Sequence, residues 1–437
     1  MAESGESLAA ERGPGPSRAA GAAAVVVALV SLALVLGGMH RVVLGDSARS
    51  RLATVWSLHH HGTWRIDQPE NPFAPHMVDK VKIDGRLLST KPPLLPLAMA
   101  AEYELLYYTL GWDLRPEGDL KKVMQVMIAT LMAGTWVLAV LAFHGLTGLF
   151  MTRPWPRVAL LAAFAFGTQA PGFATQINNH TPAMALLLVA AWLGLAMGLG
   201  RVHAARWRLA LCGCAGALVF TLDMPLTVFV AVLFAWCALR LGPRKTTWLI
   251  LGALPVLLLH FADMWFVTGS LLPIQMRPEL YFYENAYWRN PTGIDAFNEP
   301  RPSYLFHMTF GRYGSFLLFP VLLIGLAGWA RACLPGTPHR AAVWAAGIAF
   351  AILSAYYALR TNNYGGAAYG FRWYIGAMPV LLLMGAPLLD RVRRPAAWAG
   401  LALLFAVSCY SAWECWQAPW GTGQEWTCRW FFGTGLP

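Results

Sequence analysis

Long hydrophobic runs recur from one end of the sequence to the other, and they constrain the fold more than any motif does. A run of about 18 or more apolar residues is long enough to cross a bilayer as an α-helix. Of the 437 residues, 57% are hydrophobic and 13% are charged, whereas soluble domains carry roughly 25% charged residues. We therefore expect an all-α integral membrane protein that is surrounded by membrane lipids.

The net charge of +11 comes from short basic clusters between the apolar runs, which indicates membrane topology and not a nucleic-acid partner. All compact clusters fall on the cytoplasmic side if the N-terminus is cytoplasmic and segment 92–110 does not cross. This arrangement predicts about eleven spanning helices in a multi-pass protein of the cell (inner or plasma) membrane. The predicted spans are 20–44, 122–150, 157–177, 181–199, 208–222, 225–239, 246–267, 313–330, 341–359, 371–389 and 396–413.

The same reasoning divides the chain into parts. Residues 1–19 are small and polar, so we expect a disordered cytoplasmic N-terminus. Residues 20–413 form the polytopic membrane domain, whose first helix is an uncleaved anchor. Residues 45–121 form a long first outer loop that carries surface helices, with 92–110 as an amphipathic or re-entrant segment. Residues 414–437 form a short extracytoplasmic tail.

Gly45–Leu97 is the long polar interval of the chain. Asp46 lies where the first span ends, so its carboxylate is either half desolvated, with a tunable basicity, or a simple boundary residue. Arg49 shares the helical face of Asp46 if this stretch is helical. Lys91 precedes two prolines that start a helix, which suits either a lipid phosphate or a snorkelling anchor.

A polar turn, Asn178-Asn179-His180, separates two apolar runs. Asn is a good helix cap and the following Pro182 suits a first turn, so the turn is explained by helix capping alone. The three side chains also suit hydrogen bonds to sugar hydroxyls. Both interpretations stay open at this stage.

A second outer turn runs from Tyr364 to Trp373 and is rich in glycine, which permits close backbone approach to a ligand. We take Tyr364 and Tyr369 as candidate substrate-binding residues and Arg372 as a planar cation for a phosphate. Arg312 and His307 give a similar signal on the same side. The alternative is a flexible hairpin with an interfacial arginine.

The remaining candidates are histidines and cysteines. His59, His61 and His76 are weak metal ligands, because adjacent histidines cannot all point one way, and no cofactor is indicated with certainty. Cys415 and Cys428 fall in the predicted outer tail, where an oxidising exterior permits a disulfide between them.

These motifs, in their order, resemble the polytopic glycosyltransferases that use a polyprenyl-phosphate sugar (the GT-C superfamily). The similarity is greatest to the protein O-mannosyltransferases and lipid A aminoarabinose transferases. It rests on an Asp at the end of the first helix, an Arg three residues later, Lys91-Pro92-Pro93, the turn at 178–182 and the late Tyr-Gly-Gly turn. The resemblance implies that Asp46 is catalytic and that Arg49 and Lys91 contact the donor phosphate. Ser47 and Asn178-Asn179 stand where relatives often carry acidic residues, which argues against a divalent metal.

We therefore expect a transferase that moves a sugar from a polyprenyl-phosphate donor to a lipid, glycan or protein acceptor at the extracytoplasmic face. Asp46 would act as general base, and Arg49, Lys91, Arg372 and Arg312 would stabilise the leaving phosphate. The alternative is a transporter or flippase of a lipid-linked or amphiphilic substrate. A transferase gathers its polar residues at the outer face, whereas a transporter gathers them near the midplane.

Overall fold

The computed structural model describes residues 18–75 and 77–433, and it is mostly helical. The helices are α1 Arg18–Gly38, α2 Asp46–His61, α3 Leu94–Leu110, α4 Leu120–Met127, α5 Gly134–Phe150, α6 Pro154–Phe166, α7 Ala170–Phe173, α8 His180–Gly198, α9 Arg206–Leu222, α10 Thr227–Leu241, α11 Pro243–Thr268, α12 Arg301–Thr309, α13 Ser315–Leu318, α14 Leu323–Ala332, α15 Arg340–Arg360, α16 Met378–Met384, α17 Ala386–Leu389 and α18 Pro395–Gln417. The strands are β1 Lys80–Ile83 and β2 Arg86–Ser89. The predicted disorder of the N-terminus concerns residues that lie, apart from Arg18 and Ala19, outside the described ranges.

Seven helices in the described residues are long and apolar enough to cross a membrane, which indicates a multi-pass membrane protein. They are Arg18–Arg41, Leu120–Phe150, His180–Gly198, Met224–Leu241, Pro243–Thr268, Arg340–Arg360 and Pro395–Gln417. Three shorter apolar helices, Pro154–Phe166, Pro320–Ala332 and Met378–Leu389, coincide with three more of the predicted spans. The predicted span at 208–222 corresponds to α9, which has 17 residues. The count of eleven spans stays a prediction.

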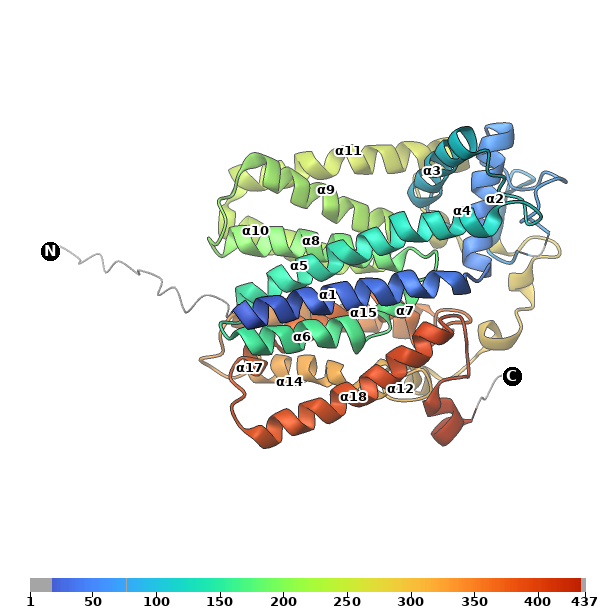
Figure 1. The fold of residues 1–437 in the computed structure, drawn as a ribbon. Coiled ribbons are helices and arrows are strands. Elements are labelled where there is room, and N and C mark those ends of the chain that lie inside the picture. Colours follow the sequence, from blue (N-terminus) through green and yellow to red (C-terminus); the bar gives the residue numbers. More distant parts are fainter. Residues whose placement is uncertain (1–17, 76, 434–437) are drawn as a thin grey trace.

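Close helix packing inside the bundle depends on glycine. A Cβ added at Gly213 of α9 would lie 1.9 Å from the Leu249 carbonyl oxygen of α11, and one at Gly252 would lie 1.9 Å from the Ala210 carbonyl oxygen. Small residues let the two backbones approach, which is how helices gain contact area where lipid removes the hydrophobic driving force. This pair therefore fixes α9 against α11, side by side in Figure 1.

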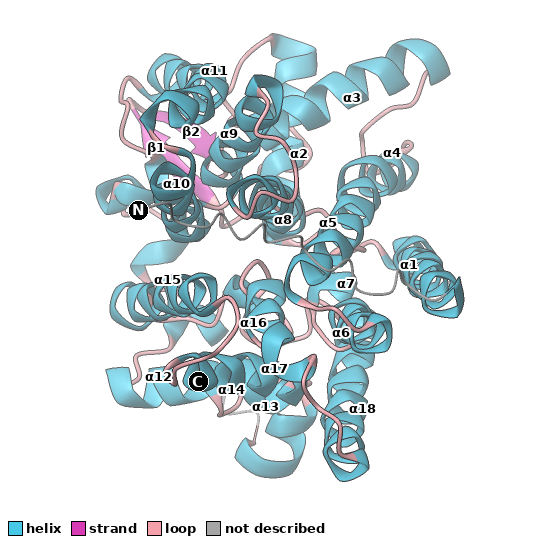
Figure 2. Cartoon of the chain, turned by 90° about the vertical axis from the view of Figure 1, so that its left-hand side faces the viewer, coloured by secondary structure: helices cyan, strands magenta, loops and turns pink. Residues whose placement is uncertain are grey.

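The long helices run roughly parallel, and α2 lies across one end of the bundle (Figure 1). Figure 2 looks along the bundle, so that many of these helices are seen end-on. The chain enters α1 at the opposite end, so the polar interval after α1 gathers at the end where α2 lies. Segment 92–110 is helical as predicted, and α3 is not among the seven helices that qualify as spans.

The expectation of an all-α chain needs one correction, because β1 and β2 form an antiparallel hairpin inside the first polar interval. Lys80 pairs with Ser89, and Ile83 pairs with Arg86. Asp84 and Gly85 connect the strands with φ values of 49° and 79°. This Asp-Gly pair suits the tight turn that matches the twist of a two-stranded hairpin.

Candidate functional site

The candidate site lies at the end of the bundle where α2 crosses. Asp46 is the first residue of α2, follows an extended Gly45 and remains exposed to solvent. An acidic residue in a first helical turn is favoured by the helix dipole. The protein encloses one side of the carboxylate, so desolvation, reinforced by the charge of Asp79, raises the pKa of Asp46. Arg49, the Val78 N–H and Lys91 oppose this shift.

The two ends of the polar interval are therefore close in space, because the charge of Lys91 lowers the pKa of Asp46. The hairpin makes this possible: it begins just after Asp79 and ends two residues before Lys91. The Lys91 ammonium lies 2.6 Å from the Asp79 carboxylate. Burial lowers the pKa of Lys91, and the charge of Asp79 acts in the opposite direction.

Arg51, which the sequence did not single out, is fully buried at 0% exposure. Its guanidinium donates to the Ser47 carbonyl at 2.8 Å and the Ser47 hydroxyl at 2.7 Å, and to the Asn179 amide oxygen at 2.8 Å. Its Nε has no hydrogen-bond partner among the described residues. Burial lowers the pKa of Arg51 to about 10, with the charge of Asp79 opposing and that of Arg372 adding to the shift.

Arg372 belongs to a late segment of the chain, and its charge acts on Arg51 and Lys91. Its guanidinium stacks over the Trp420 ring at 5.0 Å, and its buried Nε has no hydrogen-bond partner among the described residues. Burial lowers the pKa of Arg372 to about 10, while Asp79, Asp223 and Asp295 oppose the shift. The charges of Arg51 and Arg372 both lower the pKa of Lys91, and that of Arg372 lowers the pKa of Arg51, so these three cations repel one another.

The turn at 178–180 contacts these cations through Asn179, which accepts a hydrogen bond from Arg51. The Asn178 oxygen accepts the Thr181 N–H at 2.8 Å, so this buried side chain organises the start of α8. Asn179 joins Arg51 to the Leu222 carbonyl, which its amide reaches at 2.9 Å. His180 is buried and lies 2.6 Å from the Asp223 carboxylate. These contacts favour the helix-start interpretation and give Asn179 a positioning role.

Several predicted residues lie elsewhere. The Tyr364 and Tyr369 rings are buried, and their hydroxyls donate to Glu299 and Glu414 respectively. The His307 ring accepts the Arg312 N–H at 3.2 Å. Arg312 lies 3.9 Å from Glu299 and also has a further contact. These four residues organise the outer loops.

The metal and disulfide candidates are not supported by the structure. No group of three His, Cys, Asp or Glu within residues 18–75 and 77–433 is arranged to hold a metal ion. His59 instead pairs with Glu104 at 2.9 Å, His61 pairs with Glu70 at 2.9 Å, and His76 lies outside the described residues.

The expected disulfide between Cys415 and Cys428 is wrong, because both thiols are free. Helix α18 continues to Gln417, so Cys415 is held inside a helix and not in the tail. Its thiol points to the Gln169 carbonyl, whereas that of Cys428 points to the Arg312 carbonyl.

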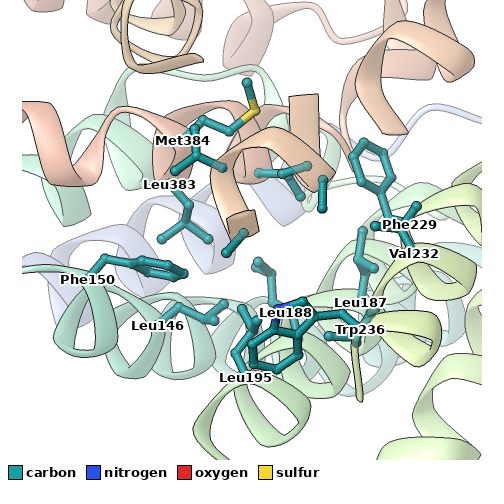
Figure 3. A pocket seen from close by; sticks show the side chains of 17 residues that line it. Leu146, Phe150, Leu187, Leu188, Leu195, Phe229, Val232, Trp236, Leu383 and Met384 are labelled. Atoms are coloured by element: carbon teal, nitrogen blue, oxygen red, sulfur yellow. The ribbon is translucent and has the colours of Figure 1, made fainter. Parts of the chain in front are cut away.

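Two cavities bear on what the site accepts. One, of about 320 Å³ counting open space, adjoins Lys91 and is lined mainly by apolar side chains from several segments, among them Leu88, Pro96 and Met264. The other, of about 740 Å³, is an apolar groove between α5, α8, α10, α15 and α16, into which Leu187, Phe229 and Leu383 project (Figure 3).

None of the residues that line the larger groove is charged. Its α8 and α10 residues lie about two turns beyond His180 and Asp223. Between the two levels the Leu226 side chain packs so closely on Gly376 that a Cβ there would lie 2.2 Å from it. The small cavity beside Lys91 is therefore the one that adjoins the charged residues.

Comparisons with known proteins add little to the geometry. No protein-family model matches the chain, and no curated protein matches it. Among solved structures it is similar to the archaeal oligosaccharyltransferase AglB from Archaeoglobus fulgidus, in complex with an inhibitory peptide and a dolichol-phosphate, with a TM-score of 0.49 and 13% identity. The match covers 92% of this chain, which spans 56% of AglB. A likeness of this degree does not define a function.

Proposed function

We propose that the protein is a membrane glycosyltransferase of the GT-C type, which moves a sugar from a polyprenyl-phosphate donor to an acceptor hydroxyl or amine at the extracytoplasmic face. One observation carries this proposal: the charges of Lys91, Arg51 and Arg372 act on one another, and Lys91 also acts on the exposed carboxylate of Asp46. Buried like charges repel one another, so such a group is stabilised by an anion that bridges them. A phosphate beside a solvent-accessible base is the arrangement that glycosyl transfer from a lipid phosphate requires.

In this mechanism Asp46 is the general base. Its raised pKa makes the ionised carboxylate a better proton acceptor near neutral pH. The acceptor oxygen or nitrogen attacks the anomeric carbon and gives its proton to Asp46. The bond between that carbon and the phosphate oxygen breaks, with inversion, and the electron pair leaves with the polyprenyl phosphate. Lys91, Arg51 and Arg372 stabilise the charge that develops on the leaving oxygen.

The cavity beside Lys91 is small and marks the place where the prenyl chain of the donor would leave the phosphate. Beside the Lys91 ammonium, its lining combines apolar side chains such as Met264 and Val267 with three hydroxyl-bearing residues. A lipid phosphate needs this combination, since its head group is charged and its chain is apolar. The outer half of α11 is exposed, with Trp265 and Phe266 at the surface, so the remaining chain can continue along the membrane-facing side of the helix.

The position of the charged residues also bears on the transporter alternative. Asp46, Lys91, Arg51 and Arg372 belong to segments at the end of the bundle where α2 lies. A transporter would be expected to hold its substrate near the middle of the spanning helices. This distribution favours a transferase.

The test is transfer by the purified protein from a panel of radiolabelled polyprenyl-phosphate hexoses and pentoses into membrane extracts. Asp46→Asn should reduce transfer by about 10²- to 10⁴-fold, the usual contribution of a general base, with unchanged elution and melting. Asp84→Asn, at the exposed hairpin turn, removes a carboxylate of the same loop and should retain full activity. Full activity of Asp46→Asn would rule out the mechanism.

A further inference from the structure

Asp79 is the residue of this site whose role remains to be explained. Its backbone is fixed from two sides: the Ser50 hydroxyl of α2 donates to its carbonyl at 2.7 Å, and the Thr90 N–H donates to the same carbonyl at 3.2 Å. The hairpin ladder begins at the next residue, Lys80. The main chain at Asp79 is thus held in place, and only rotation of the side chain can move its carboxylate.

The Asp79 carboxylate itself is held weakly by comparison. Its ion pair with Lys91 is its only hydrogen-bonded contact among the described residues, and both side chains retain 18% exposure. The same carboxylate is a counter-charge for Arg51 and Arg372. One negative group therefore serves the three cations that are assigned above to the donor phosphate.

We propose that the Asp79 carboxylate occupies the place of the donor phosphate on Lys91 in the empty site and is turned aside when the donor binds. This inference rests on the proposed function. It explains how three cations coexist without a ligand, because Asp79 compensates their repulsion. Only one ion pair has to break when the donor phosphate, a diester with one negative charge and two free oxygens, replaces the carboxylate on Lys91.

Displacement would also act on the base. The charged groups that face Asp46 are Asp79 and Asp295, which favour its protonation, and Arg49 and Lys91, which oppose it. The Val78 N–H also favours the ionised form. When Lys91 turns to the phosphate, its charge is neutralised there and stabilises the ionised Asp46 carboxylate less, which raises the pKa of Asp46 further. Donor binding then strengthens the base for the step that follows.

The first test is a binding experiment that requires neither sugar nor acceptor. Polyprenyl monophosphate is titrated into the full-length protein in nanodiscs, with the corresponding polyprenol as a control for chain binding. Asp79→Asn should bind the phosphate about tenfold tighter than the wild type, because an ion pair no longer competes. Asp79→Ala should show the same gain in affinity, and it leaves no side-chain oxygen that could still bind the Lys91 ammonium. Asp84→Asn should leave the affinity unchanged.

The higher affinity of Asp79→Asn for polyprenyl monophosphate must also depend on Lys91. Lys91→Met should weaken phosphate binding, and adding Asp79→Asn to that variant should bring no gain. If Lys91→Met weakens binding but Asp79→Asn does not tighten it, the proposal that Asp79 occupies the place of the phosphate is wrong, while the proposed function stands. If the wild type prefers polyprenyl phosphate to polyprenol by no measurable factor, both are wrong. In active protein, Asp79→Asn should move the acid limb of the rate profile to lower pH and lower the KM for the donor, which a purely structural role would not do.

Discussion

Replacing Arg51 and Arg49 separately tests the site most sharply, because the sequence pattern indicates Arg49, whereas the mechanism proposed above assigns Arg51 to the phosphate. Arg51→Met keeps an apolar stem of similar length and removes the guanidinium. Loss of one charge-assisted contact to the phosphate costs about 1.5–3 kcal/mol, which corresponds to roughly 10- to 150-fold weaker binding of polyprenyl phosphate.

The effect of Arg51→Met on stability has two opposing parts. The Asn179 oxygen loses the donor that now lies at 2.8 Å, and an unsatisfied buried acceptor costs about 1–3 kcal/mol. Removal of a fully buried cation relieves its desolvation and its repulsion of Arg372, which offsets much of this cost. We expect the protein to stay folded, with a loss of no more than about 2 kcal/mol.

Arg49→Met is the matched comparison. Arg49 stabilises the ionised form of Asp46, so its removal should raise the pKa of that carboxyl and move the acid limb of transfer to higher pH. Phosphate affinity should change little. The assays are polyprenyl phosphate binding in nanodiscs, melting temperature, and transfer rate against pH. If Arg49→Met loses the phosphate and Arg51→Met retains it, the assignment of the anion site is refuted.

Three further outcomes are expected. Burial raises the pKa of Glu425 to about 7 from its ordinary value near 4.5. The protonated form therefore stabilises the fold below about pH 4.5, and this contribution is lost as the pH rises through about 7. Glu425→Gln should remove that part of the pH dependence of the melting temperature, and an unchanged profile would contradict the assignment. Gly252→Leu should separate α9 from α11 and abolish stable insertion, because its Cβ would lie 1.9 Å from the Ala210 carbonyl; normal yield and melting temperature of this variant would refute the close contact. Thiol titration of denatured, non-reduced protein should count Cys415 and Cys428 among seven free thiols, since all seven are free, and five would show that a disulfide exists.

The sequence was sufficient to predict the membrane class and the polar end of the bundle. Hydrophobic length identifies spans directly, and the helix predicted at 92–110 is confirmed as α3. The placement of Asp46 near Lys91 also follows from their positions at the two ends of one polar interval. Each of these predictions depends on local properties of the chain.

The remaining features depend on how distant segments pack. Arg51 lies about 140° around α2 from Asp46, and nothing local indicates that this face meets Asn179 of a later turn. The position of Asp79 beside Lys91 depends on a hairpin of two four-residue strands, which are too short to stand out in a hydrophobic chain. The disulfide prediction failed because α18 continues two residues past Cys415.

The β1–β2 hairpin has a consequence for how this loop can be altered. Asp79 and Lys91 lie at its base, whereas Asp84 and Gly85 lie at the far tip and are exposed. Lengthening both strands by two residues moves only the tip and preserves the register, whereas one extra residue in a single strand reverses which side chains face inward. A reporter or an affinity tag can therefore be inserted at the tip without disturbing the pair at the base.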